Sequence, residues 1–323
     1  MSIKNKKESS CKVGMQDFRL FYNQNIYPEL LHLEQRRRRL VRLLLLSALM
    51  LAAVVAIEIL IDIFLVTLLL LIPVAIWMAY LGFRIQVFYQ EFKPRIVGLL
   101  LDFIDNSVNF SFKQYDPKGF IQPEDFLESK IFTHADEYRG EDLIEGMVRE
   151  TPFQLSELRV KEFSDVRNRL DYVFRGIFLI ADFQRADMHG GVLLLPDAYR
   201  KYLSRSEKAF HLIGGRRVKD NLLPEFEAFF DTYATKDVRI QDVISKELQH
   251  AILMFRLRFQ KVNREKEIYC SIIGDKIYLA LTQDKDLLEP SLWGSNVRFE
   301  VVNELYEDLK ILLDVVLAVD VMN

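Results

Sequence analysis

The feature that most constrains this chain is a run of 41 mostly apolar residues from Leu43 to Phe83, interrupted by Glu58 and Asp62. An apolar run longer than about 18 residues can cross a hydrocarbon core about 30 Å thick. At about 1.5 Å per residue, this run would make a helix of about 60 Å, which is twice the thickness to be crossed. The sequence therefore predicts a membrane protein in which residues 40–83 form two antiparallel spanning helices.

Both outer ends of the apolar run are basic. Arg36, Arg37, Arg38, Arg39 and Arg42 precede it, and Arg84, Lys93 and Arg95 follow it. Lysine and arginine near the ends of a span are retained on the cytoplasmic side of a membrane, so we expect both termini to be cytoplasmic. A cluster of four to eight cationic residues beside a span is also typical of binding to anionic lipids. The arginines from Arg36 to Arg39, with Arg42 and Arg84, are therefore candidate ligands of lipid headgroups as well as topology signals.

The acidic pair within the run has two interpretations. Glu58 and Asp62 would be solvated if they mark the turn between two spans, which is the arrangement we expect. Carboxylates that lie inside a bilayer are usually functional, so the same pair would instead suggest a proton path and a channel or transport subunit. The first 14 residues are polar and the apolar run starts late, so we do not expect a cleaved signal peptide.

Charge is distributed unevenly along the chain. Residues 1–42 carry a net charge of +6, and residues 84–323 carry a net charge of −7. Nucleic-acid binding requires clustered cationic residues that neutralise phosphates, so we expect no nucleic-acid partner for the large acidic part. The two cysteines, Cys11 and Cys270, suggest neither a disulfide framework nor a metal site.

Hydrophobic periodicity predicts an α+β protein, with a transmembrane helical hairpin followed by a mixed, mainly antiparallel sheet and packed helices. The expected order is a disordered tail (1–14), a juxtamembrane helical segment (15–39), the hairpin (40–83), a stalk helix (84–107) and a cytoplasmic α+β domain (108–323).

Several elements of the expected domain have specific signals. Strands are expected at 108–112, 143–148 and 153–160, with a turn at Thr151-Pro152, and the run 172–183 is apolar on both faces and predicts a central strand. Gly274-Asp275 predicts a two-residue turn within a hairpin over 267–282. Helices are expected over 238–261 and about 296–319, the second with Glu300, Glu304, Glu307 and Asp308 on its solvated side.

Catalytic motifs are absent from the sequence. It contains no G-x-S-x-G, G-x-G-x-x-G, G-x-x-x-x-G-K-[ST] or H-E-x-x-H pattern, and no two histidines have the i, i+4 spacing of a helical metal site, so we expect no cofactor and no metal. Asp142 and Asp182 would bind a cation or act as an acid/base pair if the fold brought them together. Arg175, inside the predicted central strand, requires a carboxylate partner. These three residues are the catalytic candidates, and pairing among them is the structural alternative.

Two glycine-rich segments have both a functional and a structural interpretation. Gly214, Gly215, Arg216 and Arg217 form a candidate anion-binding loop, with amides and guanidinium groups as ligands, or an ordinary solvated loop. His189-Gly190-Gly191 is similar to an oxyanion-hole turn, but no nucleophile elbow accompanies it, so we interpret it as a loop.

The order of several short motifs resembles a known family. These are Leu33-Glu34-Gln35-Arg36-Arg37, the two-span hairpin, Tyr138-Arg139-Gly140-Glu141-Asp142, the strand 173–183 and Phe229-Phe230-Asp231-Thr232-Tyr233-Ala234. They are similar to an uncharacterised bacterial two-span membrane family, catalogued as a domain of unknown function and sometimes mislabelled galanin. The resemblance implies an inner-membrane location, gives no catalytic residues, and suggests a LemA-type helical membrane protein as a partner.

The sequence as a whole favours a membrane-anchored cytoplasmic binding or scaffolding module, with a protein or lipid headgroups as its ligand. Two other functions stay open. One is an enzyme that acts on a membrane-associated substrate, and the other is a subunit of a membrane channel or transport complex.

Overall fold

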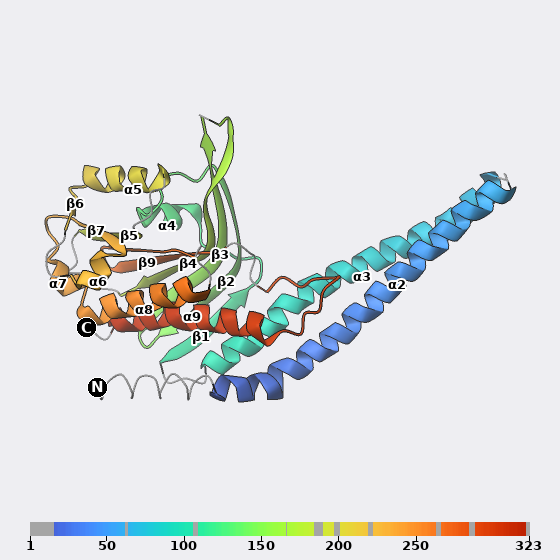
Figure 1. The fold of residues 1–323 in the computed structure, drawn as a ribbon, viewed down its shortest axis with the longest axis horizontal. Coiled ribbons are helices and arrows are strands. Elements are labelled where there is room, and N and C mark those ends of the chain that lie inside the picture. The colour runs from blue at the N-terminus through green and yellow to red at the C-terminus, as the bar shows by residue number, and fades with distance from the viewer. Residues whose placement is uncertain are drawn as a thin grey trace. The chain divides into compact units, whose positions relative to one another are not determined.

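A computed structural model of the chain describes residues 16–61, 64–105, 109–165, 167–183, 190–196, 201–218, 222–262, 266–283 and 288–320 (Figure 1). The chain divides into two compact units. The first holds the chain up to Phe103 together with Leu288–Asn303, and the second holds Ile104–Leu287 together with Glu304–Asn323. The tail expected to be disordered lies outside the described residues.

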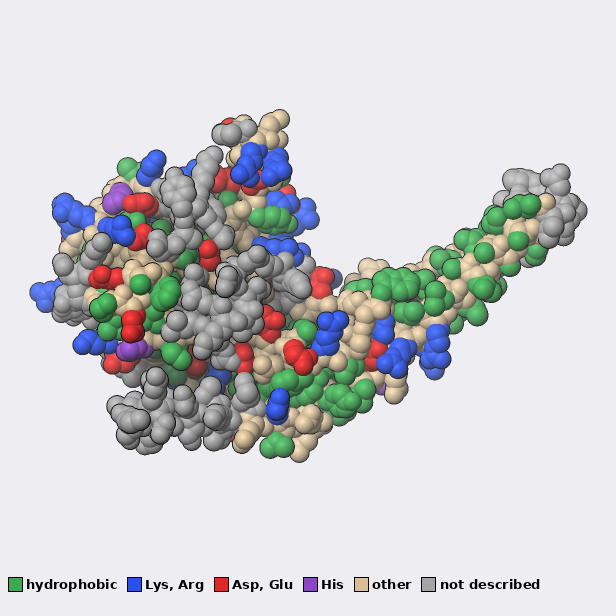
Figure 2. Space-filling model, viewed as in Figure 1, with side chains coloured by type: hydrophobic (Ala, Val, Ile, Leu, Met, Phe, Trp, Pro, Cys, Tyr) green, Lys and Arg blue, Asp and Glu red, His purple; other side chains and the backbone are tan. Residues whose placement is uncertain are grey.

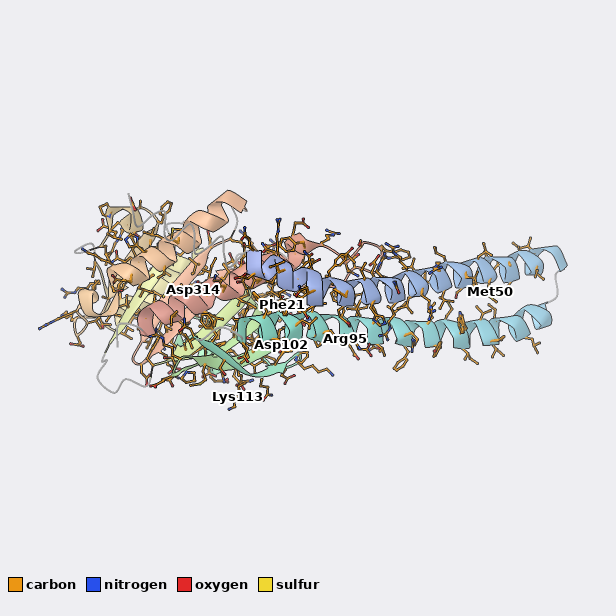
Figure 3. The ribbon with its side chains drawn as sticks, turned by 90° about the horizontal axis from the view of Figure 1, so that it is seen from below. Phe21, Met50, Arg95, Asp102, Lys113 and Asp314 are labelled. Atoms are coloured by element: carbon orange, nitrogen blue, oxygen red, sulfur yellow. The ribbon has the colours of Figure 1, made fainter. Side chains whose placement is uncertain are left out.

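The first unit is built on a long helical hairpin. Residues 16–21 are α-helical and lead into a five-residue π-helix, η1 (Tyr22–Ile26), which is followed directly by α2 (Tyr27–Ile61). The second arm, α3 (Phe64–Asp105), runs beside α2 in both ribbon views (Figures 1 and 3). Pro73 and Pro94 both lie inside α3, so the expected second span and stalk form one continuous helix.

Aromatic side chains pack between separate segments of this first unit. The ring of Phe18 lies 5.3 Å from that of Phe103, and the ring of Tyr22 lies 4.9 Å from that of Phe299. Phe299 begins α9 (Phe299–Asp320), and its ring also lies under the guanidinium group of Arg19, 5.2 Å away. Residues 288–303 thus pack with the hairpin although they are distant in sequence, and no local sequence pattern indicated this grouping.

The second unit contains a nine-stranded sheet with the strand order β1-β2-β3-β4-β9-β8-β5-β7-β6. Every described strand pair is antiparallel. The strands are β1 (Phe110–Asp116), β2 (Glu137–Val148), β3 (Thr151–Ser164), β4 (Arg169–Asp182), β5 (Gly191–Pro196), β6 (Arg216–Arg217), β7 (Phe230–Ala234), β8 (Ile268–Ile273) and β9 (Lys276–Thr282).

Helices lie on both sides of this sheet. Figure 1 shows α4 (Pro123–Glu128) and α5 (Lys201–Leu212) on one side, and α8 (Lys246–Val262) and the later part of α9 on the other. The short helices α6 (Pro224–Glu227) and α7 (Ile240–Val243) lie between β6 and α8 in the sequence. The fold is therefore α+β, as the sequence predicted.

The core of the second unit is rich in aromatic rings. Phe126 from α4 stacks on Phe132 with ring centroids 4.8 Å apart, and its ring lies 5.0 Å from that of Phe178 on β4. Phe174 and Tyr269 also contact Phe132, and all five side chains are almost fully buried. Burying a large apolar side chain contributes about 1.5–3 kcal/mol, so this cluster stabilises the packing of α4 against the sheet.

Several local predictions are confirmed. β4 pairs with β3 on one side and β9 on the other, so the run that is apolar on both faces is a central strand. Gly274 and Asp275 connect β8 to β9, and Gly274 has φ +59, the left-handed conformation that a two-residue hairpin turn requires.

Other local predictions are wrong in detail. The turn between β2 and β3 is at Arg149-Glu150 rather than Thr151-Pro152, and Arg149 takes φ +53. The helix expected over 238–261 is two helices, α7 and α8. It breaks because Ser245 acts as an N-cap, with its Oγ accepting the Leu248 N–H at 3.1 Å.

Candidate functional site

The hairpin exposes apolar side chains along most of its length. Leu49, Ile59, Leu69 and Ile76 are all about two-thirds exposed or more, at 69%, 78%, 70% and 67%. The core helix of a soluble protein is mostly buried, whereas most of the apolar window of each candidate span is exposed. The chain therefore has two helices long and apolar enough to cross a membrane. Within the described residues, no other part of the chain buries most of their apolar surface.

The apolar parts of both arms match the thickness of a bilayer. From Leu43 to Ile61 in α2, and from Phe64 to Phe83 in α3, each helix would extend about 28–30 Å. Of the acidic pair within the apolar run, the side chain of Glu58 and all of Asp62 lie outside the described residues.

A polar contact links the two arms near one end of the apolar run. The indole Nε1–H of Trp77 donates to Ser47 Oγ at 2.9 Å, and the Ser47 hydroxyl donates to the Leu43 carbonyl at 2.7 Å. The Tyr80 ring lies 5.7 Å from that of Trp77. Amphipathic aromatic side chains are enriched at the membrane–water interface, so Trp77 and Tyr80 have the position in the hairpin that is typical of residues at the headgroup level.

The arginines of α2 are divided by the helix into two sets. At about 100° per residue, Arg36, Arg38, Arg39 and Arg42 fall within one arc of about 160°, and Arg37 projects from the opposite side. The prediction from the sequence grouped all five of these arginines as one cluster. In the folded hairpin they form a four-arginine face and one separate residue.

The four-arginine face lines a groove with a cavity volume of about 730 Å³. Arg84 from α3 completes the cationic lining, and Leu40, Leu43, Trp77, Tyr80 and Leu81 supply an apolar and aromatic lining. The remaining lining residues are His32 and Gln35, so no carboxylate lines the groove. Figure 2 shows the lysine and arginine side chains gathered on one stretch of the hairpin, with green apolar surface continuing from there towards its tip. We call this site the basic groove.

Two arginines of the basic groove already have carboxylate partners. Arg36 is paired with Glu91 of α3, and Arg38 Nε lies 3.0 Å from Glu34 Oε1. Arg39, Arg42 and Arg84 are exposed, and within the described ranges no carboxylate pairs with any of them. The groove therefore has three guanidinium groups whose charge is not compensated locally.

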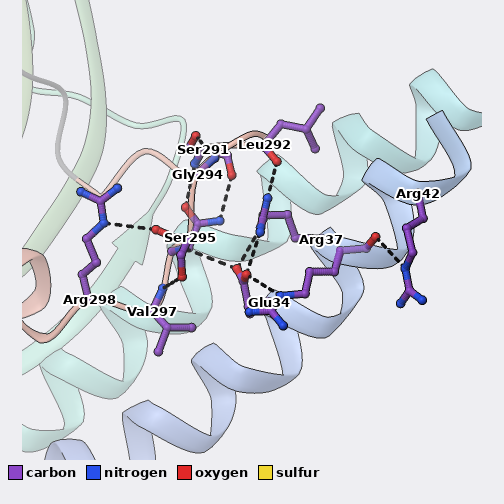
Figure 4. Close-up of polar contacts among 11 residues, drawn as sticks. Glu34, Arg37, Arg42, Ser291, Leu292, Gly294, Ser295, Val297 and Arg298 are labelled. Atoms are coloured by element: carbon purple, nitrogen blue, oxygen red, sulfur yellow. Dashed lines mark hydrogen bonds and ion pairs between the residues drawn. The ribbon is translucent and has the colours of Figure 1, made fainter. Parts of the chain in front are cut away.

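Arg37 instead has a structural position (Figure 4). Its guanidinium donates to both carboxylate oxygens of Glu34, at 2.9 and 2.7 Å, and to the Leu292 carbonyl at 2.6 Å. Both side chains of the pair are at least 90% buried, and Glu34 also accepts the Asn296 N–H at 3.4 Å. Arg37 therefore ties α2 to the segment 288–303 and does not face the basic groove.

The second unit separates two of the three catalytic candidates, Asp142 and Asp182. Asp142 lies on β2, where its Oδ1 accepts the Tyr115 hydroxyl at 2.6 Å. Across β3, Glu141, the residue before Asp142, aligns with Ile177 of β4. Asp182 lies five residues beyond Ile177, at the end of β4, where it is opposite Lys276. Five residues of strand extend about 17 Å, so the two aspartates do not form an acid/base pair. Arg175 is in register with Arg159.

Asp142 belongs to an acidic cluster that sequence reasoning missed. The ligand atoms of Glu141, Asp142 and Glu157 lie within 4.8 Å of one another, at a β-bulge where Asp142 takes φ +61. Arg159 Nη2 lies 2.6 Å from Glu141 and 3.5 Å from Glu157, so a cation of the protein itself already partly neutralises the group. The cluster thus behaves as an ion-pair network in the described structure.

The predicted anion loop is the C-terminal cap of α5. The Gly214 N–H donates to the His211 carbonyl and the Gly215 N–H to the Phe210 carbonyl, each at 3.0 Å. Arg217 is paired with Asp231 of β7, and Arg216 is exposed. The two amides therefore complete the helix end and do not point at an anion. In the other glycine segment, His189 lies outside the described residues, and the Gly191 N–H donates to Thr235 Oγ1 at 2.9 Å.

A buried charge on α9 was also missed. Asp308, expected on the solvated side, is 1% exposed and accepts hydrogen bonds from Lys266 at 3.2 Å and Gln283 at 2.8 Å. Burial raises the pKa of Asp308 to about 7, although the positive charge of Lys266 acts in the opposite direction. The sequence pattern placed this residue wrongly, because Asp308 lies next to the buried stripe of α9, and its burial depends on Lys266 and Gln283, which are distant in sequence.

Comparison with known proteins gives a single assignment. Residues 172–320 match a family model described as "Protein of unknown function (DUF3137)". The match runs from β4 to the end of α9 and leaves out the hairpin. It confirms the expected domain of unknown function over this part of the chain. No match was found among curated proteins or among solved structures.

Proposed function

We propose that this chain, whose residues 172–320 match a family of unknown function, is a membrane-anchored binding module. Its hairpin crosses the bilayer twice and holds the α+β domain at the membrane surface. The observation that carries this proposal is the exposed apolar surface of α2 and α3, which extends over about the thickness of a hydrocarbon core.

The positions of the basic residues support one orientation. The basic groove lies at the end of the apolar run where α2 enters and α3 leaves, so the positively charged ends of both helices are on the same side. Positive residues near the ends of spans are retained on the cytoplasmic side, which supports a cytoplasmic α+β domain on an inner membrane. Tethering there raises the local concentration of the domain at the surface and favours partners that are themselves membrane-bound, such as another helical membrane protein.

Extraction of membranes with alkaline carbonate tests the anchor. We expect the full chain to stay in the membrane pellet. Lysine in place of Val55 and Ile72, which lie near the middle of each apolar segment and are 47% and 57% exposed, should release it, because each buried lysine costs about 3 kcal/mol. Lysine at Leu212 and Ile213, exposed apolar residues of the α+β domain, is the matched control and should change nothing. Release of the unaltered chain by carbonate would contradict the proposal.

A further inference from the structure

The basic groove has the composition of an anion site and not that of a general surface. Five arginines line it and no aspartate or glutamate does. Arg39, Arg42 and Arg84 have no carboxylate partner within the described ranges, so an incoming anion would not have to displace an existing ion pair from them. Guanidinium groups bind phosphate oxygens through parallel N–H donors, which makes phosphate the anion that such a group of arginines suits best.

The rest of the groove indicates where that phosphate comes from. Leu40, Leu43 and Leu81 bring apolar surface to the same cavity, and Trp77 and Tyr80 bring amphipathic rings. Leu43 is the first residue of the apolar run, so the cationic end of the groove adjoins the start of the span. A free phosphate would gain nothing from this lining, whereas a phospholipid has a phosphate joined to glycerol and acyl chains.

The shape of the site is fixed by contacts around it. Arg36 is held by Glu91 across the hairpin, Trp77 is held by Ser47, and Arg42 Nε donates to the Arg38 carbonyl at 3.3 Å. These contacts restrain both arms of the groove before any ligand binds. Restraint of this kind lowers the entropy cost of binding.

We propose that the basic groove binds the phosphate of an anionic phospholipid headgroup, with Arg39, Arg42 and Arg84 as its ligands and Trp77 and Tyr80 beside the glycerol. This inference rests on the proposed membrane anchor and makes it more specific, since basic pockets between spanning helices on the cytoplasmic side bind such headgroups. The lipid would fix the depth and rotation of the hairpin in the bilayer.

Quenching of Trp77 fluorescence tests the inference directly. The full chain carrying Trp293→Phe has Trp77 as its single tryptophan. It is reconstituted in bilayers of phosphatidylcholine with a small fraction of phosphatidylglycerol, with bromine on the acyl chains of one lipid or of the other. We expect brominated phosphatidylglycerol to quench Trp77 more than its mole fraction predicts. Equal quenching by the two lipids at equal mole fraction would overturn the proposal.

Substitutions identify the ligands. Glutamine at Arg39, Arg42 and Arg84 together should lower the relative affinity for phosphatidylglycerol by roughly fivefold for each arginine, or about 100-fold in all. Glutamine at three exposed arginines of the α+β domain, Arg139, Arg216 and Arg239, removes the same charge and should leave the preference unchanged. The same loss in both triple variants would show a nonspecific charge effect and overturn the assignment.

Two further measurements distinguish a lipid from a free anion as the ligand, and failure of this inference from failure of the membrane anchor. Millimolar inorganic phosphate should not relieve the quenching, and relief by phosphate alone would mean that the site takes a free anion and would overturn the lipid assignment. Carbonate extraction of the same reconstituted samples reports on the anchor. Failure of the proposed function appears as release of the chain, whereas failure of this inference appears as an inserted chain without lipid preference.

Discussion

Replacement of Arg37 by alanine tests whether this arginine differs in kind from its neighbours. The substitution removes two hydrogen bonds to Glu34 and one to the Leu292 carbonyl, and leaves Glu34, whose side chain is 4% exposed, without its main partner. Removing one member of a buried pair costs about 3–5 kcal/mol. Arg38 Nε remains 3.0 Å from Glu34, so we expect the lower end, about 3 kcal/mol.

Hydrogen exchange of the segment 288–303 is the appropriate assay, because the lost contacts hold this segment on α2. Its amides include those of Ser291 and Gly294, which donate to Asn296 Oδ1 at 2.7 Å and to Ser291 Oγ at 2.8 Å. Amides that exchange through local opening report the free energy of that opening. A loss of about 3 kcal/mol corresponds to exchange roughly 100-fold faster.

Arg39→Ala is the matched control for this experiment. Arg39 lies two residues further along the same helix, is exposed, and makes no contact with the segment 288–303 among the interactions of the described residues. We expect its exchange pattern to equal that of the unaltered chain within about threefold. Unchanged exchange in Arg37→Ala, or the same acceleration in Arg39→Ala, would refute the division of the arginines into a structural residue and a ligand set.

Three further predictions concern the α+β domain. Because burial raises the pKa of Asp308 to about 7, above the value of about 3.9 in an unfolded chain, the folded state binds the proton more tightly and stability rises as pH falls from 7 towards 4. Urea unfolding at pH 5 and pH 8 should show a smaller difference for Asp308→Asn, and an undiminished difference would contradict this. Gly176→Ala should destabilise the sheet by more than about 2 kcal/mol, because its Cβ would lie 1.9 Å from the Leu281 carbonyl oxygen at φ +150, whereas Gly82→Ala, with nothing within 4 Å, should not. Cys270 is buried and burial raises its thiol pKa, so in a Cys11→Ser background it should react with iodoacetamide only after unfolding, and labelling of Cys270 in the folded protein would show that its strand opens.

The parts of the fold that were predicted correctly have local causes. The hairpin follows from the length of one apolar run, and the β8–β9 turn follows from the φ that Gly274 can adopt. The central position of β4 follows from apolar residues on both of its faces. Each signal is contained within one short stretch of sequence, so no knowledge of distant contacts was needed.

The parts that were missed depend on contacts between distant segments. β5 is a six-residue, fully buried strand, and a run that short has no period by which to distinguish it from a buried helix. Asp308 was placed on the solvated side because Lys266 and Gln283, 42 and 25 residues away, are not visible from the pattern of α9.

The candidate site was predicted in composition but not in geometry. The arginine run and Arg84 were recognised as possible headgroup ligands. Helical rotation then separates Arg37 from the others, and the hairpin brings Arg84 and Trp77 to the same groove. The partner of Arg37 on the segment 288–303 lies 255 residues away, which no local pattern can reveal.

Cysteine accessibility tests most directly the central claim that the hairpin crosses a bilayer with both basic ends on one side. In a Cys11→Ser background, where the remaining native Cys270 is buried, one variant carries Asp62→Cys, between the two apolar segments, and another carries Leu212→Cys, which replaces an exposed residue of the α+β domain. A maleimide that cannot cross membranes should label the first variant in intact cells and the second only after the cells are permeabilised. Labelling of both in intact cells, or of neither until permeabilisation, would contradict the account.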